Sequence, residues 1–437
     1  MLKHLKMSNV GPSPKMEMEL APRLNLIAGD NGLGKSFLLD LAWWALTRRW
    51  LREVNTKMLS GYPVKPRNTK EKATLEFSLS AKTKSAVRYE STYNPRDEAW
   101  AGKAGRPWNP GLVIYAHSDG GFSVWDPARN YWKKKGNVDV QERLPAYVFT
   151  ASEVWDGLWV DEDGQRRTPI CNGLLYDWAS WIREKGKEAD AMERALRQLS
   201  PPTDDSSQLR PGPLMRLSVN DARDIPSIQT SYADAVPILH ASSGIRRVVA
   251  FAYMMTWTWK EHRLAAEQLG EEATTQVTLL VDEVESHLHP RWQRVILRSL
   301  MELAAVLHHQ AQVQLLVATH SPMVMASVES WFDEEQDALF HLKLRERQVL
   351  LEQMPWSKQG DVVNWLVSDL FGLEQGRSLE AEKAIEAAEA WMRGERSALP
   401  NGLDSQDTIH QELLRVLAGH DHFWPRWIVS TQKGRLT

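Results

Sequence analysis

The chain has 437 residues, of which 43% are hydrophobic and 25% are charged, and its formal net charge is −3. This length and composition predict a globular protein of two or more lobes and exclude a chain that is basic throughout. No segment approaches the roughly 18 apolar residues that span a bilayer. The single cysteine, Cys171, excludes an internal disulfide framework and is expected in the core. We therefore expect a cytoplasmic protein with no membrane partner.

The first residues form short apolar runs that predict strands. Met1–Val10 and Met16–Leu20 flank the turn Gly11–Pro14, and Leu24–Ala28 has the length of a buried strand. A helical pattern follows from Phe37 to about Trp50.

The segment between that strand and that helix has the spacing of a phosphate-binding loop. Its sequence, GDNGLGKS, matches G-x-x-x-x-G-K-[ST]. Glycines let the backbone wrap around phosphate oxygens, so Lys35 would reach the β- and γ-phosphates of a nucleotide and the Ser36 hydroxyl would bind Mg²⁺. The residues expected at the nucleotide are Gly29, Asp30, Asn31, Gly32, Leu33, Gly34, Lys35, Ser36 and Phe37.

A basic, turn-rich segment extends from Thr47 to Lys72. A solvated loop is the simpler interpretation, and a surface that follows DNA phosphates through residues 48–72 is the functional one. The 20 tryptophans leave a similar choice between core packing and a surface for a partner. The basic residues are Arg48, Arg49, Arg52, Lys57, Lys65, Arg67, Lys70 and Lys72.

The middle of the chain changes from strand to helix patterns. Ala73–Leu79, Ala86–Thr92 and Leu112–Ala116 predict strands of a β-rich lobe, whereas Asn172–Leu199 predicts helix. The composition of Ser200–Pro213 is that of a linker.

A small-residue turn, ASSG (residues 241–244), enters a long apolar helix predicted over Val248–Trp259. Free N–H groups at a helix N-terminus can bind an anion, although the same residues serve equally well as a helix cap. Ser242, Ser243 and Gly244 are the candidates there.

Two carboxylates, Asp282 and Glu283, follow the buried-strand run in VTLLVDEVESHLHP (residues 277–290). Ligands of an open α/β sheet bind at the carboxyl ends of its strands, so Asp282 would hold Mg²⁺ with Ser36 and Glu283 would take the proton of the attacking water. A separate metal site at His287 and His289 is disfavoured, because residues two apart do not share a helix face.

A second buried-strand run, in VQLLVATHSP (residues 313–322), ends at a polar tip that contains His320. A histidine at this position could donate a hydrogen bond to the γ-phosphate and sense its loss. With Glu283 and Lys35, it completes the set of expected catalytic residues.

In this order, the four motifs resemble those of an ABC-type ATPase head of the RecF, SMC and OLD group. GDNGLGKS is similar to the Walker A motif, ASSGIRR to the signature motif, LLVDEVESHLHP to Walker B with its D-loop, and ATHSP to the switch-histidine motif. The similarity covers about residues 1–50 and 230–330, and its wording is that of the RecF/OLD-like branch, which includes AAA-family ATPases of antiphage defence.

The resemblance implies a particular working cycle. Two heads would bind two ATP molecules between them, each Walker A completed by the signature of the other copy, with Ser242 and the Gly244 N–H on the γ-phosphate. The signature reads ASSGI instead of the commoner LSGGQ, and no Q-loop glutamine stands out. The implied cofactors are ATP and Mg²⁺, and the implied assembly is a homodimer or a larger homo-oligomer.

We expect an α/β fold: an ABC-type P-loop ATPase head with a β-rich lobe, a mainly helical insertion and a small α+β C-terminal extension. The extension reads as a hairpin, Leu339–Leu344 and Val349–Glu352, followed by helices around Val362–Leu370 and Leu379–Met392; it is short for the nuclease domain of OLD proteins. The expected divisions are 1–50, 51–150, 151–229, 230–338 and 339–437.

Three functional hypotheses follow. The first is an ATP-hydrolysing switch of a bacterial antiphage module that controls a separate effector protein, a nuclease or a toxin. The second is a RecF-like DNA-repair ATPase that binds DNA directly. The third, a nucleotide-bound scaffold without turnover, is disfavoured by Glu283, since a pure clamp does not need a general base.

Overall fold

The computed structural model describes residues 1–80, 86–102, 107–135, 138–162, 166–202, 208–230, 233–307 and 310–433. The chain forms two compact units, Met1–Gly360 and Asp361–Thr437. Among the described residues, no helix combines the length and the apolar character that a bilayer span requires.

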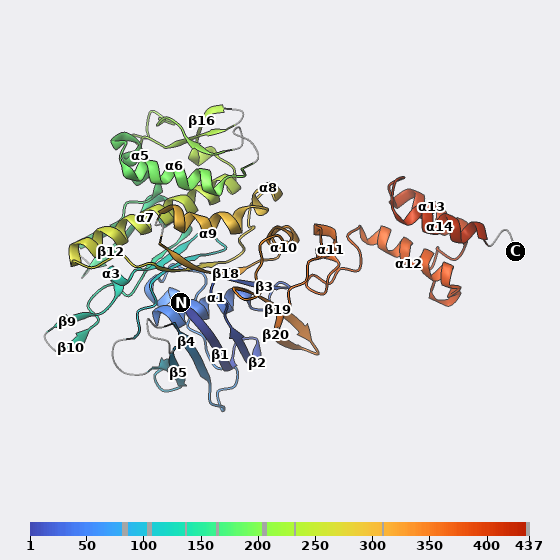
Figure 1. The fold of residues 1–437 in the computed structure, drawn as a ribbon, viewed down its shortest axis with the longest axis horizontal. Coiled ribbons are helices and arrows are strands. Elements are labelled where there is room, and N and C mark those ends of the chain that lie inside the picture. The colour runs from blue at the N-terminus through green and yellow to red at the C-terminus, as the bar shows by residue number, and fades with distance from the viewer. Residues whose placement is uncertain are drawn as a thin grey trace. The chain divides into compact units, whose positions relative to one another are not determined.

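An eight-stranded sheet forms the centre of the first unit (Figure 1). Its five inner strands, from β7 to β19, run parallel, and the strands outside them pair antiparallel. In spatial order the strands are β11 (Tyr147–Phe149), β8 (Phe122–Trp125), β7 (Leu112–Ala116), β17 (Gln276–Val281), β18 (Gln312–Ala318), β3 (Leu24–Gly29), β19 (Asp337–Arg345) and β20 (Gln348–Met354).

The inner strands are apolar runs because both faces of this sheet are covered. In β3 the register places Leu26 opposite Val317 of β18 and opposite Leu339 of β19. The strands predicted at residues 24–28, 277–281 and 313–318 are therefore confirmed, and they are neighbours in the order β17, β18, β3. The predicted hairpin is also present, and it extends this sheet beyond β3.

A second, antiparallel sheet has five strands. In spatial order these are β2 (Ser13–Glu19), β1 (Leu2–Val10), β4 (Thr74–Leu79), β5 (Val87–Asn94) and β6 (Ala99–Ala101). Strands predicted within residues 51–150 are thus divided between the two sheets: β4 and β5 pair beside β1, whereas β7 pairs with β17. The amide of Gln314 joins the sheets, donating to the carbonyl oxygens of Leu2 (2.7 Å) and Ala21 (2.9 Å).

Helix α1 (Lys35–Thr47) lies between the two sheets. Ten of its residues are buried. This is expected for a helix that is apolar on nearly every side and is covered by a sheet on two of them. Its side chains share one core cluster with residues of both sheets, including Leu5, Phe77 and Leu316.

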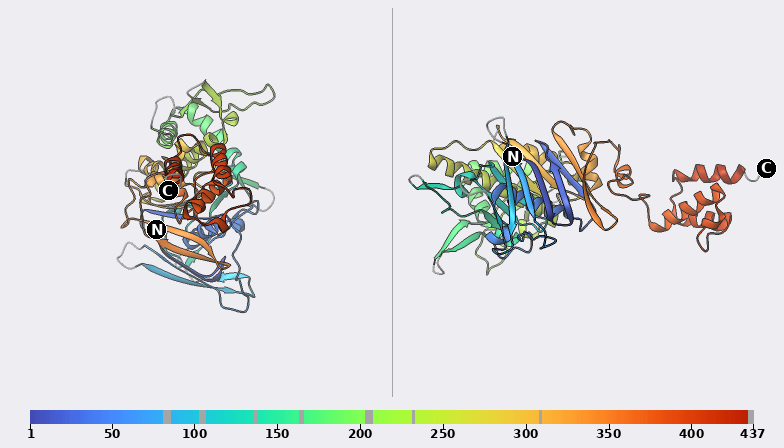
Figure 2. Two further views of the ribbon diagram at one scale, coloured as in Figure 1. Left: turned by 90° about the vertical axis from the view of Figure 1, so that its right-hand side faces the viewer. Right: turned by 90° about the horizontal axis from the view of Figure 1, so that it is seen from below.

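Helices cover the other face of the central sheet, opposite the antiparallel sheet (Figures 1 and 2). They are α5 (Leu174–Glu184), α6 (Lys187–Leu199), α7 (Ser243–Leu269) and α9 (Ile296–Leu307). The helix predicted over residues 172–199 is two helices, because Lys185 adopts a positive φ of 52° and ends the first. Cys171 is buried, as expected.

Shorter elements connect these layers. They are α2 (Leu51–Val54), α3 (Pro127–Asn130), β9 (Lys133–Lys135), β10 (Val138–Val140), α4 (Ala151–Asp156), β12 (Leu158–Glu162), β13 (Arg166–Cys171), β14 (Arg210–Pro211), β15 (Ser227–Thr230), β16 (Ala233–Pro237), η2 (Ile238–His240), α8 (Pro290–Gln293) and α10 (Pro322–Val328).

The second unit is helical in its described part. Ile385, Ile409, Leu413 and Trp427 contribute to its own apolar core. Its elements are α11 (Val362–Leu366), α12 (Leu379–Arg393), η3 (Arg396–Ala398), α13 (Gln406–Val416) and α14 (Phe423–Lys433). The two helices predicted in this region, near residues 362–370 and 379–392, are both observed.

Candidate nucleotide-binding site

The phosphate-binding loop joins the end of β3 to the start of α1, as predicted. Two of its glycines are required by the backbone. Gly29 has φ 143°, and a Cβ there would lie 2.2 Å from the carbonyl oxygen of Leu342 in β19. Gly34 has φ 102° and directly precedes the helix. Asp30, Asn31 and Gly32 are exposed at the tip of the loop.

Lys35 places its ammonium group inside the curve of this loop. The Nζ atom donates to the carbonyl oxygens of Gly29 (2.6 Å) and Asp30 (2.8 Å). Burial lowers the pKa of Lys35, and the nearby carboxylates of Asp282 and Glu283 oppose that shift. The ammonium group is therefore held at the point where the sequence predicts a phosphate.

Two of the remaining predicted loop residues, Leu33 and Phe37, pack against the protein. Leu33 is buried, and Phe37 packs on the turn between β1 and β2, because a Cβ on Gly11 would lie 2.3 Å from its ring. These two side chains support the shape of the loop from behind.

Asp282 follows the last residue of β17. Its backbone N–H donates to the carbonyl oxygen of Ala116 in β7 (2.9 Å). Burial raises the pKa of Asp282, and interactions with the hydroxyl groups of Ser36 and Ser118 oppose that rise. Its Oδ1 atom is buried without a hydrogen-bond partner in the described chain. A buried carboxylate oxygen of this kind, beside the hydroxyl of Ser36, fits the hard oxygen ligands that Mg²⁺ prefers.

Glu283 has a positive φ of 48°, which is unusual for a residue with a side chain. This backbone geometry places Glu283 Oε1 3.7 Å from Nε2 of His320, with 44% of the Glu283 side chain and 29% of the His320 side chain exposed. Burial and the neighbouring Lys35 lower the pKa of His320, so the imidazole is neutral at pH 7. The structure therefore brings Lys35, Glu283 and His320 together.

Three residues of this site were not expected from the sequence. Glu285 accepts hydrogen bonds from the Thr319 hydroxyl (2.8 Å) and from the backbone N–H of His320. Arg247 is 5% exposed and donates to the carbonyl oxygens of His117 (2.6 Å) and Asp282 (3.4 Å).

The third is Asp40, one helical turn after Ser36. It accepts a hydrogen bond from the Tyr115 hydroxyl (3.1 Å). Burial raises its pKa to about 7. Spacing along α1 could have indicated this residue, because residues four apart share a helix face.

The signature residues lie at the start of α7. Ser242 and Ser243 are exposed, and the Ser242 hydroxyl accepts from the N–H of Ile245 (3.4 Å) as a helix cap. A Cβ on Gly244 would lie 2.5 Å from the carbonyl oxygen of His287 in the D-loop. Within the described chain, no hydrogen bond joins these three residues to the phosphate-binding loop of the same copy.

One of the two histidines at which a separate metal site was disfavoured has a structural role: Nδ1 of His289 accepts from the N–H of Arg291 (3.3 Å) and caps α8. Gln141 donates to the carbonyl oxygen of Asn130 (3.1 Å).

The fold and the site together define a class. A glycine loop joins a parallel strand to a helix, a histidine follows the next strand, and an acidic pair follows the strand after that. This is the arrangement of an ABC-type P-loop ATPase. The predicted α/β fold class is confirmed. The model of the family described as "AAA domain, putative AbiEii toxin, Type IV TA system" matches residues 24–326. The chain belongs to this family.

Solved structures of two related kinds are similar to the chain. An SMC head domain from Thermotoga maritima has 13% identity and a TM-score of 0.38, covering 81% of this chain and 99% of that one. An Smc head domain with an extended coiled coil, bound to the C-terminal domain of ScpA derived from Pyrococcus furiosus, has 11% identity and a TM-score of 0.41, covering 81% and 96%. The recombination mediator protein RecF has 14% identity and a TM-score of 0.37, covering 80% and 98%.

Proposed function

We propose that this protein hydrolyses ATP with Glu283 as the general base. The convergence of Lys35, Glu283 and His320 at the carboxyl ends of three adjacent parallel strands carries this proposal. Glu283 is exposed enough to reach a water molecule, and its backbone geometry directs it toward His320. A carboxylate in this position can accept the proton of the attacking water.

Ser36 and the unpartnered Oδ1 of Asp282 would hold Mg²⁺ beside the loop. When bound, the ion neutralises charge on the β- and γ-phosphate oxygens. Lys35 orients the same phosphates through the hydrogen-bond donors that it now directs to Gly29 and Asp30. The neutral imidazole of His320 can donate one hydrogen bond without adding a second positive charge to that of Lys35.

ATP would also join two copies of the chain. The exposed Ser242 and Ser243, at the N-terminus of a 27-residue helix, would receive a γ-phosphate from another copy. Gly244 packs on the D-loop, the segment that follows Glu283. Contact of the signature residues with a partner's nucleotide would therefore be linked to the position of Glu283, the general base.

We assign the resulting switch to the control of a separate effector, a nuclease or a toxin, in a bacterial antiphage module. The family description, which names a putative AbiEii toxin of a type IV toxin–antitoxin system, supports a place for the chain in a module of this kind. Direct DNA binding through residues 48–72 has less support, because Lys57, Lys65 and Lys72 are each paired with a glutamate.

The decisive experiment measures ATP turnover and solution mass for the wild type and Glu283→Gln, each with and without ATP and Mg²⁺. We expect the variant to lose about 10²-fold or more in turnover, as for removal of a general base, and to accumulate as an ATP-bound dimer or larger species. Glu271→Gln, an exposed glutamate beyond the end of α7, is the matched control. A wild type that neither hydrolyses ATP nor changes mass would refute the proposal.

A further inference from the structure

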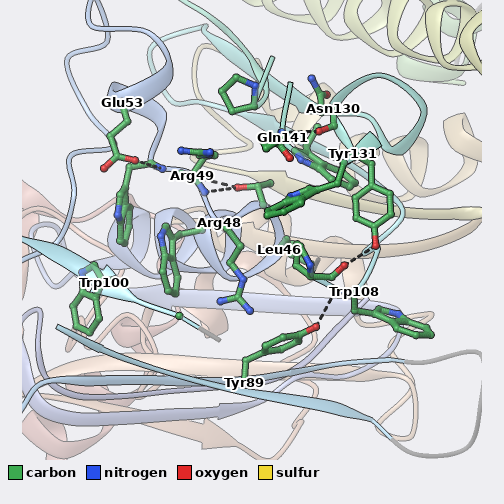
Figure 3. A pocket seen from close by; sticks show the side chains of 18 of the residues that line it. Leu46, Arg48, Arg49, Glu53, Tyr89, Trp100, Trp108, Asn130, Tyr131 and Gln141 are labelled. Atoms are coloured by element: carbon green, nitrogen blue, oxygen red, sulfur yellow. Dashed lines mark hydrogen bonds between the residues drawn. The ribbon is translucent and has the colours of Figure 1, made fainter. Parts of the chain in front are cut away.

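A cavity of about 570 Å³ lies at the end of α1 that is remote from the phosphate-binding loop (Figure 3). Helix α1 has 13 residues. At a rise of about 1.5 Å per residue, Thr47 at its end lies roughly 18 Å from Lys35 at its start. Its walls come from this helix end, from β5 and β6, and from residues 107–145. Protein interiors are close-packed, and a cavity of this size is typical of a small-molecule site.

The walls of this cavity are aromatic. Eight lining residues carry aromatic rings, among them Tyr89 and Tyr131. Hydrogen bonds hold two of the walls in place: the Tyr89 hydroxyl accepts from the N–H of Trp108 (2.8 Å), and the Trp100 indole donates to the carbonyl oxygen of Val64 (2.9 Å). The six tryptophans are Trp44, Trp50, Trp100, Trp108, Trp125 and Trp132.

Arg48 directs its guanidinium group toward Tyr89 inside this cavity (Figure 3). The guanidinium carbon lies 3.9 Å from the ring centroid of Phe77, 4.5 Å from that of Tyr89 and 5.3 Å from that of Trp44. The group makes no hydrogen bond or ion pair within the described chain, and burial lowers its pKa to about 10. A half-buried guanidinium group with five donors and no acceptor can bind an anion.

The backbone at Arg48 supports a role for this side chain. Arg48 ends α1 with φ 63°, in the left-handed conformation for which glycine is the usual choice. Helix termination alone would therefore favour glycine, and an arginine here carries a conformational cost of about 1 kcal/mol.

The other charges around the cavity leave it cationic. Arg49 and Arg88 add two exposed guanidinium groups. Of the two lining carboxylates, Glu98 is paired with Lys65 (2.7 Å) and Glu53 accepts from the N–H of Trp50 (3.3 Å). Flat aromatic walls select a planar ring, and arginines select phosphate or carboxylate.

We propose that this cavity binds a nucleoside monophosphate, with its base stacked on the tryptophans and its phosphate on Arg48. A mononucleotide fits better than a nucleic-acid strand, because three lysines of the surrounding basic segment, Lys57, Lys65 and Lys72, are each paired with a glutamate. The site is separate from the ATP site at the other end of α1.

The test uses the full chain carrying Lys35→Ala, so that binding at the phosphate loop is suppressed. AMP, GMP, CMP and UMP are titrated in turn, with calorimetry and tryptophan fluorescence as readouts. We expect at least one of them to bind at a single site. We also expect ribose 5-phosphate, which has the charge but no base, to bind at least tenfold more weakly.

Variants in the same background locate the site. Arg48→Gln is expected to weaken binding about tenfold or more, as for loss of a charged hydrogen bond. Arg49→Ala, an exposed position that does not endanger folding, is expected to weaken it several-fold. Arg67→Ala, an exposed arginine of the same basic segment outside the cavity, is the matched control and should change nothing.

Thermal melts confirm that each variant is folded. The proposal is overturned if none of the four nucleotides binds, or if Arg48→Gln and Trp108→Ala both leave the affinity unchanged. A single-stranded oligonucleotide that binds more than tenfold tighter than its mononucleotide, in an Arg48-dependent way, would also overturn it in favour of a strand-binding site.

Discussion

The carboxylate of Glu285 accepts a hydrogen bond from the backbone N–H of His320, which lies 35 residues further along the chain. A second hydrogen bond, from Thr319, fixes the same carboxylate. Because β17 and β18 are neighbours, this contact connects the segment after the acidic pair to the segment that carries the histidine. Glu285 is therefore a positioning residue for His320.

We expect Glu285→Ala to lower kcat for ATP about tenfold, since loss of a hydrogen bond to a charged group costs about 1.5–3 kcal/mol. KM for ATP should change less than kcat, because within the described chain Glu285 makes no hydrogen bond to the phosphate-binding loop and acts on Lys35 only through its charge. Steady-state turnover measures both quantities. Glu302→Ala, an exposed glutamate of α9, is the control. A variant whose KM alone changes would argue against positioning.

Asp40→Asn is expected to stabilise the nucleotide-free and metal-free protein more at pH 8 than at pH 5. The folded-state pKa of Asp40 is raised from 3.8 to about 7. A raised pKa means that the neutral form favours folding, and this contribution declines as pH rises from about 4 to about 7. At about 1.4 kcal/mol per pKa unit, the gain should grow by roughly 2–3 kcal/mol between the two pH values. Urea unfolding at pH 5 and pH 8 checks this, and an equal gain at both would contradict it.

Two glycines of the phosphate loop should differ in their tolerance of alanine. Gly29→Ala places a Cβ 2.2 Å from a backbone carbonyl oxygen of β19, whereas Gly32→Ala meets nothing within 4 Å. Both have positive φ, so Gly32→Ala should lose only the conformational cost of about 1–2 kcal/mol. Thermal melts should show a much larger loss of stability for Gly29→Ala than for Gly32→Ala. Equal losses would show that β19 moves to accommodate the added Cβ.

Ser242→Arg should abolish the ATP-dependent increase in mass of the Glu283→Gln protein and leave nucleotide binding to the monomer unchanged. The exposed Ser242 makes no hydrogen bond to the phosphate loop of its own copy within the described chain. Size measurement by light scattering and titration with a fluorescent ATP analogue separate the two effects. Ser218→Arg, on an exposed turn, is the control. A dimer that persists in Ser242→Arg would place the interface elsewhere.

Asp282→Asn should separate stability from activity. Burial and the neighbouring Glu283 raise the pKa of Asp282, so its ionised form destabilises the metal-free protein at pH 7.5. We expect the variant to melt at a higher temperature without Mg²⁺ and to need at least about tenfold more Mg²⁺ for half-maximal turnover. An unchanged Mg²⁺ requirement would exclude Asp282 from the metal site.

The sequence predicted the loop and the three strands that form the site because each is a local pattern. An apolar run followed by glycines or carboxylates can be recognised without its partners. Glu285 and Arg247 could not be assigned in this way, since their partners lie far along the chain: Arg247 contacts His117 and Asp282. Contacts of this kind depend on the order of strands in the sheet.

The role of Arg48 also depends on contacts that a local sequence pattern does not reveal. The sequence places it first in a basic segment, where a solvated loop or a DNA-binding surface is the natural interpretation. In the structure it stacks on Phe77 and Tyr89 of neighbouring strands. One local signal was available: Trp44 precedes Arg48 by four residues and so shares its helix face. The division of residues 51–150 between two sheets had no such signal, because strand pairing is not local.

The hairpin of β19 and β20 has a practical consequence for fragment work. The strand that carries the phosphate-binding loop, β3, pairs with β19 along its whole length. A fragment cut at residue 338 would leave β3 at the edge of the sheet, with unpaired N–H and C=O groups that invite aggregation. Leu342, which packs against Gly29, would also be missing. A soluble fragment for crystallisation should therefore end at Gly360, where the first compact unit ends.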